Sequence, residues 1–235
     1  MTTEVEQSEP DDGVYAANTR GTYTRRSDLA RYDARAINAT IDEALISHVG
    51  YVDDGDPIVV PVIHTRIDET LYLHTSTGSR LARLAADGTR LCVTVSLLDG
   101  LVLARSQVGH NVNYRSVVVR GEGRLLTDET EKQAVLAEVV EHMVAGRSRH
   151  SRPPTAEELE AVSLVRLPLD DVSLKSRSGP PNDEEQDLAL HHWAGVLGVR
   201  NAYGPAFPAP DLPYDRPVPA QLTNYSRSAR PQGYR

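Results

Sequence analysis

The stretch at residues 71–88 (LYLHTSTGSRLARLAADG) constrains the fold most, because a strand, a turn and a helix are expected to follow one another there. It opens with apolar, β-favouring residues at 71–73, directly after the turn residues Asp68 and Glu69. A helical apolar spacing begins at Leu81, and Gly88 stands where a glycine commonly ends a helix. A strand leading into a short helix is therefore predicted.

The turn between them, residues 74–80 (HTSTGSR), is rich in hydroxyl groups and ends in an arginine. The first N–H groups of a helix have no partner inside the helix, and its dipole favours negative charge at that end. Hydroxyls, a glycine at 78 and a bidentate donor at Arg80 are suited to a phosphate monoester. An ordinary Ser/Thr N-cap with Arg80 on a solvated face explains the same residues. Both interpretations are open from these residues alone.

Composition excludes several classes of protein. Acidic residues outnumber basic ones, 33 to 25, and the formal charge of −8 argues against a nucleic-acid binder. Cys92 is the only cysteine, so an intrachain disulfide and a cysteine-based metal centre are excluded, and its apolar surroundings indicate a small buried hydrophobe. No apolar run is long enough to span a membrane, and the acidic N-terminus does not resemble a secretion signal, so a cytoplasmic protein is expected.

Short apolar runs predict mainly strands in the first half of the chain. A helix is expected from Ile37 to near Gly50, and residues 58–64 form a strand in which Pro61 implies an edge position or a bulge. Residues 71–74 form its hairpin partner. Further strands are predicted at 91–98 and 101–105, joined by a tight turn at Asp99-Gly100, and at 116–126.

The second half adds helices and a tail. A helix capped by Asp128 and Glu131 is predicted to end at Met143, a shorter one is capped by Thr155 and Glu158, and strands follow at 162–169 and 172–174. After Trp193 the chain is rich in Pro, Gly and Tyr, so mostly irregular structure is expected. The pattern predicts a mainly β fold with peripheral helices, a small antiparallel barrel. We expect an acidic, then arginine-rich arm at 1–31, one domain at 32–200 and a Pro/Tyr/Arg-rich extension at 201–235.

Several pieces of the sequence resemble the pyridoxamine 5′-phosphate oxidase-like flavoproteins, in particular the flavin-nucleotide-binding branch related to nitroimidazole reductases. The most distinctive are LDGLVLARS at 98–106 and NYRSVVV at 113–119. They are joined, in order, by YDARAINATIDEAL (32–45), HVGYV (48–52), PIVVPVIHTR (57–66), LYLHTSTGSR (71–80), AGRSRHSRPPTAEEL (145–159), LKSRSGPPND (174–183) and WAGV (193–196). The resemblance implies a Greek-key split β-barrel that forms a homodimer and binds FMN at the dimer interface.

The resemblance also implies the site residues. Thr75, Ser76, Ser79 and Arg80 would hold the flavin phosphate. The groups expected along the rest of the cofactor are His64, Thr65, Tyr114, Arg115, Ser116, Lys175, Arg177 and Trp193. Candidate catalytic residues are His74, His110 and Tyr114, although a histidine that ends a strand is more often structural and Tyr114 fits an interface aromatic equally well. The adjacent His191 and His192 would point apart, so no metal site is expected.

The function implied is that of an FMN-dependent oxidoreductase acting on a small organic substrate, with a nicotinamide donor or dioxygen as redox partner. The turn lacks the lysine that strict pyridoxamine phosphate oxidases carry after their arginine, and no match to their C-terminal substrate-phosphate signature is found, so vitamin B6 oxidation is not expected. A second hypothesis is a non-catalytic or differently loaded barrel that holds a deazaflavin (F420) or haem. Haem would need an axial ligand, for which His64, His74 and His110 are the candidates.

Overall fold

The computed structural model describes residues 13, 15, 30–212, 216–223 and 225–226. Nearly all of the expected arm at 1–31 therefore lies outside the described residues. The strands are β1 (Ala30–Arg31), β2 (Ile46–Asp53), β3 (Asp56–Ile67), β4 (Thr70–Ser76), β5 (Thr89–Leu103), β6 (Asn111–Leu125), β7 (Val162–Pro168), β8 (Val172–Arg177) and β9 (Gly195–Gly198). The α-helices are α1 (Ala34–Glu43), α2 (Arg80–Ala86), α3 (Glu129–Met143) and α4 (Ala156–Ala161).

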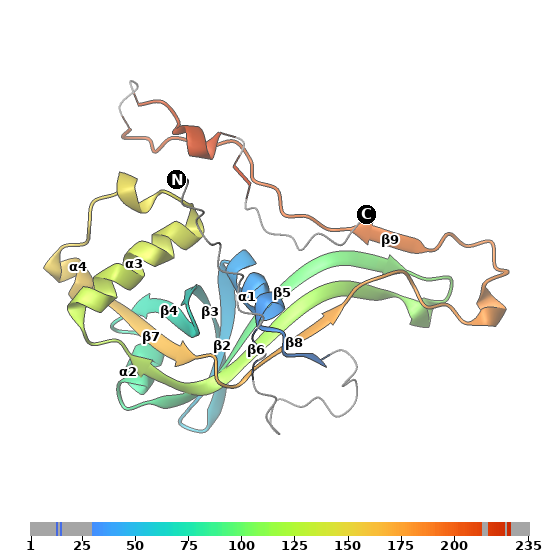
Figure 1. Cartoon of the computed structure of the whole chain (residues 1–235), viewed down its shortest axis with the longest axis horizontal. Helices are drawn as coiled ribbons and strands as arrows, with labels where there is room; N and C mark the ends of the chain where they lie inside the picture. Colours follow the sequence, from blue (N-terminus) through green and yellow to red (C-terminus); the bar gives the residue numbers. More distant parts are fainter. Residues whose placement is uncertain (1–12, 14, 16–29, 213–215, 224, 227–235) are drawn as a thin grey trace, which may run out of the picture. The chain divides into compact units, whose positions relative to one another are not determined.

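Six strands close into a barrel. Strands β6, β7, β4, β3, β2 and β5 lie side by side in this order, and β5 also pairs with β6, which joins the two ends of the row. Strand β8 extends β6 and carries β1, while β9 pairs with β5. The registers that define these neighbours are antiparallel. The mainly β antiparallel fold with a few helices (Figure 1) confirms that part of the sequence prediction and is consistent with a split barrel.

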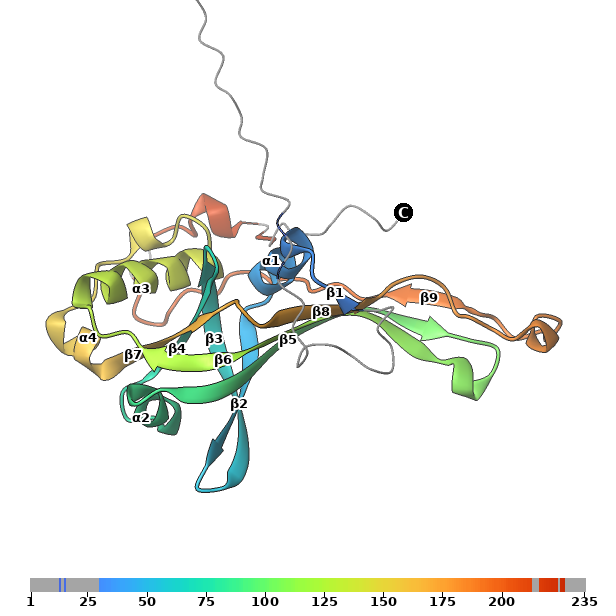
Figure 2. The same ribbon diagram turned by 60° about the horizontal axis from the view of Figure 1, so that its bottom comes forward.

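Contacts divide the chain into two compact units, residues 1–97 with 114–177 and residues 98–113 with 178–235. The first unit holds the barrel and the four α-helices. The second consists of the ends of β5 and β6 and the C-terminal segment with β9, which lies beside β5 in Figure 2. Within it, the Asp183 carboxylate accepts hydrogen bonds from the backbone N and Nη1 of Arg105 at 2.8 and 2.6 Å. The three sequence-based segments, 1–31, 32–200 and 201–235, stay a prediction.

The barrel core is aliphatic and is covered by helices on different sides. Leu71, Leu73 and Leu167 are completely buried within it, together with Ile37 and Ile41 of α1. Helices α1 and α3 pack against β3, whereas α2 contacts β2, β4 and β7 at one end of the barrel (Figure 1). The polar turn before α2 is therefore carried on the end of a strand whose inner face is buried.

The Asp128 N-cap, the capping box of Thr155 and Glu158 and the first hairpin are confirmed, whereas the Glu131 side chain accepts from the Tyr72 hydroxyl and does not complete a capping box at α3. Asp128 accepts a hydrogen bond from the backbone N of Glu131 at the start of α3, and Thr155 and Glu158 form a complete capping box at α4. Strands β3 and β4 are joined through Asp68, whose φ of 49° is one that suits a tight hairpin turn. Pro61 lies where β3 pairs with β2 alone, because its pairing with β4 begins at Ile63. The expected edge position is thus correct locally.

The predicted helix from Ile37 to near Gly50 is too long. Helix α1 ends at Glu43, Ala44 is already extended, and β2 begins at Ile46. Ser47, Val49 and Tyr51 are buried while their neighbours along the strand are more exposed. Such alternation is typical of a strand, and pairing with β3 and β5 decides the conformation in favour of β2.

The predicted tight turn at Asp99-Gly100 is wrong, because β5 runs without interruption from Thr89 to Leu103. Gly100 has a different use. A Cβ built there would lie 3.0 Å from Cγ1 of Val196 and 3.2 Å from the carbonyl oxygen of Leu197, so the glycine lets β9 approach β5 closely.

Candidate cofactor site

The hydroxyl-rich turn is ordered by hydrogen bonds of its own side chains. Ser79 is the N-cap of α2 and accepts from the backbone N of Ala82 at 3.0 Å, and it also accepts from the Thr75 hydroxyl at 2.9 Å. The hydroxyl of Ser79 itself is thus left as a donor. Thr77 donates to the carbonyl oxygen of Glu160 at 2.6 Å, which ties the turn to the end of α4. Ser79 is therefore an N-cap, as the first interpretation requires. Its oriented hydroxyl can also donate to a phosphate, as the second interpretation requires.

Arg80 stands at the start of α2 and is available to an anionic ligand. Its side chain is 65% exposed, and its Nε lies 3.6 Å from a carboxylate oxygen of Asp53, which is a loose contact. Arg83, one turn later, makes the closer ion pair with Asp53 at 2.9 Å and is 63% exposed. The Asp53 side chain is only 10% exposed and contacts both arginines, which links α2 to the β2–β3 hairpin. A phosphate at the turn would have Arg80 as its charge-assisted donor.

A groove of about 790 Å³ lies beside α3, within the first unit. We call it the α3 groove. Its floor is formed by one face of α3 and by Ile63, His74 and Val162, and its outer wall is the segment 148–154 with Glu158. The side chains that α3 contributes recur at helical spacing and are Gln133, Leu136, Ala137, Val139, Val140 and Met143. Its volume falls within the range of roughly 300–1,000 Å³ that is common for cofactor and small-molecule sites.

His74 is the histidine of the α3 groove. It pairs with Ile63 across the β3–β4 ladder, one residue before Thr75 of the turn. Burial lowers the pKa of His74 below its ordinary value of 6.5, although a hydrogen bond with its backbone opposes the effect. A neutral imidazole in an apolar groove has a lone pair that can coordinate a metal ion or accept a proton.

The outer wall of the groove is held by two carboxylates. Glu141 accepts hydrogen bonds from the backbone N of Gly146 and from the backbone N and hydroxyl of Ser148, and these bonds lower the pKa of Glu141. Glu158 receives the Arg152 guanidinium at 2.6 and 2.7 Å and the backbone N of Thr155 at 2.8 Å, which lower the pKa of Glu158 to about 2. Both carboxylates therefore remain charged at neutral pH and keep the wall in place.

The structure brings the expected residues of β6 and β8 together. Tyr114 pairs with Arg177 and Ser116 with Lys175 in the β6–β8 ladder. Arg115 is engaged by a bidentate ion pair with Glu43 of α1, at 2.7 and 3.1 Å. In the strand order, β7 lies between β6 and β4. Within one chain these residues of β6 and β8 are therefore not adjacent to the hydroxyl-rich turn at 74–80, which we also call the phosphate turn. Their joint role at one cofactor stays a prediction.

His64 and Thr65 are buried in the first unit, on the strand beside β4. His64 is completely inaccessible, and its Nε2 donates to the carbonyl oxygen of Ile41 at 3.1 Å. Its ring centroid lies 5.5 Å from that of His142, whose Nε2 donates to the carbonyl oxygen of Ala44 at 2.8 Å. In this structure His64 joins β3 to α1 and α3, and its role toward a cofactor stays a prediction.

Two candidates belong to the second unit. His110 is exposed and its Nδ1 donates to the carbonyl oxygen of Ser106 at 2.9 Å. Trp193 is 70% exposed and its ring covers the backbone of Gly195, where an added Cβ would come within 2.7 Å. Their predicted roles at the cofactor stay predictions.

The α3 groove itself was not predicted from the sequence. Leu136, Val140 and Met143 repeat at helical spacing, a pattern that by itself indicates an apolar helix face and not a groove. In the structure Met143 is 42% exposed at the groove. No single segment signals the groove, because its lining comes from β3, β4, α3, the segment 148–154, α4 and β7.

The family model of pyridoxamine 5′-phosphate oxidase matches residues 33–176, which include all six barrel strands and the hydroxyl-rich turn. The chain belongs to this family. The resemblance found in the sequence is therefore confirmed. No curated protein matches this chain.

Solved structures similar to this chain include a flavocytochrome and an FAD and haem binding protein. The flavocytochrome Anf3 from Azotobacter vinelandii is 37% identical, with a TM-score of 0.82 over 87% of this chain and 95% of that one. The FAD and haem binding protein from Mycobacterium smegmatis is 31% identical, with a TM-score of 0.79 over 83% and 95%. A candidate 5-nitroimidazole antibiotic resistance protein from Bacteroides thetaiotaomicron shares the fold at 24% identity, with a TM-score of 0.54 over 63% and 86%.

The described residues include neither a membrane-spanning helix nor a cluster of metal-binding side chains. None of their helices is long and apolar enough to cross a membrane. Nowhere in the described ranges do three or more His, Cys, Asp or Glu side chains gather as ligands for a metal ion. An iron held by a porphyrin needs no such cluster, because the protein supplies only one or two axial ligands.

Proposed function

We propose that this protein is a redox protein of the flavocytochrome type, which binds a flavin nucleotide at the turn 75–80 and haem in the α3 groove. The observation that carries the proposal is His74, a groove histidine whose backbone leads directly into the phosphate turn. One strand end would thus serve both cofactors. Similarity to a flavocytochrome and to an FAD and haem binding protein over more than four-fifths of the chain supports it.

The flavin phosphate fits the turn because Ser79, Arg80 and the neighbouring hydroxyls supply donors there. This is the site expected for FMN. We propose FAD in its place, because the relative at 31% identity binds FAD and a dinucleotide also presents phosphate oxygens. The residues of β6 and β8 would complete the site from a second copy of the chain.

The α3 groove fits haem through the chemistry of its lining. The face of α3 offers an apolar surface to a porphyrin, His74 offers a neutral imidazole as axial ligand, and Arg149 and Arg152 on the wall offer cationic groups to propionates. Arg152 already serves Glu158, so Arg149 is the more available of the two arginines.

Flavins carry one or two electrons, and haem carries one, so a protein that holds both can pass electrons singly between carriers. The chain itself would position and insulate these groups. His74 would hold the iron, Arg80 would neutralise the flavin phosphate, and the wall fixed by Glu141 and Glu158 would limit the access of water to the groove. The external electron donor and acceptor are proposed to be small molecules, with a nicotinamide donor and dioxygen as the first to test.

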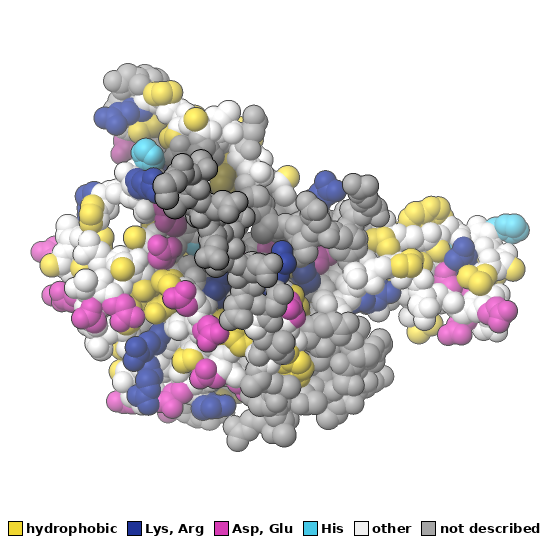
Figure 3. All heavy atoms as spheres, in the orientation of Figure 1, with side chains coloured by type: hydrophobic (Ala, Val, Ile, Leu, Met, Phe, Trp, Pro, Cys, Tyr) yellow, Lys and Arg dark blue, Asp and Glu magenta, His cyan; other side chains and the backbone are white. Residues whose placement is uncertain are grey.

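The proposed functional form is a homodimer. Most of the exposed large hydrophobic side chains lie in the second unit, where yellow side chains gather in Figure 3. They are Leu98, Leu101, Val108, Val112, Leu188, Leu190, Trp193, Val196, Leu197, Tyr203, Phe207, Leu212 and Val218. Exposed apolar surface of this extent is typical of an interaction surface, and a second copy of the chain is the partner we propose.

An absorption spectrum of the purified protein, before and after loading with haem and FAD, tests the function. We expect flavin bands together with a Soret band. His74→Ala should abolish the Soret band and leave the flavin bands, whereas His110→Ala, a change at an exposed histidine of the second unit, should leave both. Mass spectrometry of the released flavin distinguishes FAD from FMN.

Each part of the proposal can fail separately. Flavin uptake without any haem uptake would reject the haem site and favour a flavin-dependent oxidoreductase with the α3 groove as its substrate site. Haem uptake that survives His74→Ala would reject His74 as the ligand. A protein that takes up neither cofactor would overturn the proposed function.

A further inference from the structure

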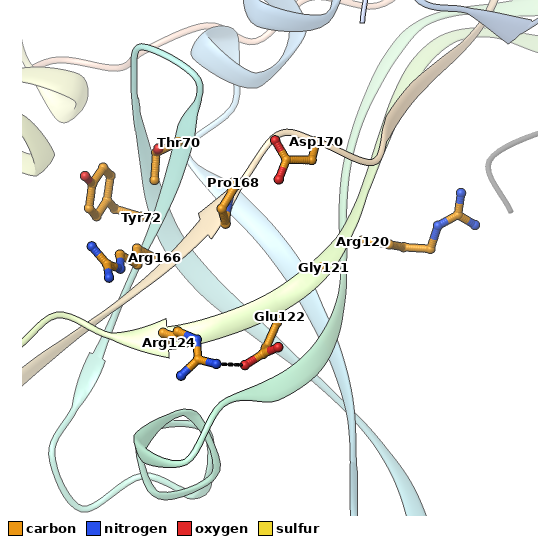
Figure 4. Close-up of a pocket in the computed structure, with 9 residues that line it drawn as sticks. All are labelled: Thr70, Tyr72, Arg120, Gly121, Glu122, Arg124, Arg166, Pro168 and Asp170. Carbon is orange, nitrogen blue, oxygen red and sulfur yellow. Dashed lines mark ion pairs between the residues drawn. The ribbon is translucent and has the colours of Figure 1, made fainter. Parts of the chain in front are cut away.

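A second hollow, of about 380 Å³, lies on the barrel where β4, β7 and β6 run side by side. Figure 4 shows its lining side chains, which come from Thr70 and Tyr72 of β4, Arg166 and Pro168 of β7, Asp170, and residues 120–124 of β6. We call it the arginine hollow. It shares no lining residue with the α3 groove and none with the turn at 75–80.

Two arginines lie next to each other at one end of this hollow. Arg124 and Arg166 are directly paired in the β6–β7 ladder. Like charges at directly opposed positions destabilise a sheet unless an opposite charge compensates them. Glu122 forms an ion pair with Arg124, whereas within the described part of the chain no carboxylate forms an ion pair with Arg166. Basic side chains also gather over β7 and the adjoining end of β6 in Figure 3. The pair therefore lacks one negative charge.

The other arginine that lines the hollow is not available. Arg120 points away from the remaining lining residues in Figure 4 and binds Asp171 at 3.2 Å. The Tyr72 hydroxyl is also occupied, because it donates to Glu131 of α3 at 3.3 Å. Burial and the charge of Glu131 raise the pKa of Tyr72, so the phenol remains neutral and forms a wall without a negative charge.

The opposite end of the hollow offers an acceptor. Asp170 follows Pro168 at the far side from Arg166, and no ion pair engages its carboxylate among the described residues. Thr70 adds a hydroxyl, and Pro168 provides an apolar surface between the two ends. Gly121 keeps β6 close to β7 beneath them, since a Cβ there would lie 2.8 Å from Cδ1 of Leu167. One end thus offers cationic donors and the other offers a hydrogen-bond acceptor.

We propose that the arginine hollow binds a hydroxylated phosphate ester, namely a sugar phosphate or the ribose phosphate part of a nucleotide. Its phosphate would be held by Arg166 and Arg124, which match phosphate geometry as bidentate donors. Its sugar hydroxyls would donate to the Asp170 carboxylate. The site does not depend on the proposed flavin and haem sites, because it uses different residues.

Calorimetric titration of the full-length, flavin-loaded protein with ribose 5-phosphate, inorganic phosphate and ribose tests this site. Loading occupies the turn at 75–80, and an Arg80→Ala variant checks that the turn is not the site measured. We expect saturable binding of ribose 5-phosphate, weakened about tenfold or more by Arg166→Gln, because a charge-assisted hydrogen bond is lost. Arg90→Gln, at an exposed arginine outside the hollow, should change nothing.

The two ends are separated by a second variant. Asp170→Asn should weaken ribose 5-phosphate several-fold and leave the affinity for inorganic phosphate unchanged or increased. Absence of saturable ribose 5-phosphate binding would overturn the proposal, as would affinity that survives Arg166→Gln. Equal effects of Asp170→Asn on ribose 5-phosphate and on inorganic phosphate would contradict the assignment of the hydroxyls to Asp170. If binding is present but the flavin does not load, the hollow stands and the flavin site fails.

Discussion

At the scale of single residues, Arg80 and Arg83 form a matched pair for testing the phosphate turn. Both are on α2, both face Asp53, and their exposures are nearly equal. Arg80→Ala should weaken flavin binding by about 1.5–3 kcal/mol, the range for a hydrogen bond to a charged group. Arg83→Ala should leave flavin affinity unchanged. Fluorescence titration of the apoprotein with FAD and FMN measures both.

The control also shows what would count against the turn. Loss of flavin affinity in both variants would indicate that Asp53 and the charge of α2 matter, and not Arg80 as a direct donor. Equal affinity in the wild-type protein and in Arg80→Ala would favour the simpler interpretation of Ser79 and Arg80 as a helix cap with a solvated neighbour.

His74 gives the cofactor-free protein a pH-dependent stability. Because its pKa in the folded protein lies below the ordinary value of 6.5, the unfolded chain binds the proton more readily. The contribution of His74 is therefore complete above pH 6.5 and is lost as the pH falls through the lowered pKa. The free energy of unfolding should decrease from about pH 7 to pH 5, and His74→Gln should reduce that slope, as measured by urea denaturation. An unchanged slope would show that other groups cause it.

At the scale of elements, sequence patterns within one segment correctly predicted the features that depend on neighbouring residues, such as helix N-caps. Ser79, Asp128 and Thr155 are N-caps because a hydroxyl or carboxylate can satisfy helix N–H groups wherever the helix packs. The turn predicted at Asp99-Gly100 was wrong because Gly100 packs against β9, about a hundred residues later in the chain. The C-terminal half of the helix expected after Ile37 was wrong for a similar reason, because this segment pairs with β3 and β5 as strand β2.

The candidate site was predictable in part for the same reason. The hydroxyl-rich turn is one continuous segment, so the Ser79 N-cap could be predicted from the sequence, and its role as a phosphate site stays a prediction. The α3 groove combines β3, β4, α3, α4 and β7, and the arginine hollow depends on the register that sets Arg124 opposite Arg166. Neither arrangement has a signal within one segment, so only the folded chain reveals it.

The glycines of β6 provide a prediction about barrel packing. A Cβ at Gly123 would lie 2.3 Å from Cδ1 of Leu91 and 3.0 Å from Cγ1 of Val165, and both side chains are buried. Gly123→Ala should therefore reduce the free energy of unfolding by about 1–3 kcal/mol through overpacking. Gly78→Ala is the matched control, since a Cβ there would meet nothing within 4 Å. Chemical denaturation measures both, and equal stability of Gly123→Ala and the wild type would contradict the close approach.

At the scale of the whole molecule, the proposed homodimer depends on the apolar surface of the second unit. Leu197 of β9 is 58% exposed although it is a large aliphatic residue. Leu197→Lys should convert the dimer to a monomer, because burying an unpaired charge at an interface is costly. Light scattering coupled to size-exclusion chromatography measures the mass. Glu184→Lys, which changes an exposed acid of the same unit, should remain dimeric. A wild-type monomer at micromolar concentration would reject the dimer.

Because β5 and β6 are shared between the two units, the protein cannot be truncated simply at a unit boundary. A fragment that stops at Arg177 ends at a unit boundary in sequence, yet it still encodes residues 98–113, which belong to the other unit. Those residues would lose β9 and the Asp183 carboxylate that binds Arg105, and Leu101 and Val102 would be left at an unpaired strand edge. Such a fragment should aggregate. A shortened barrel would need a second change, in which a tight two-residue turn replaces residues 98–113.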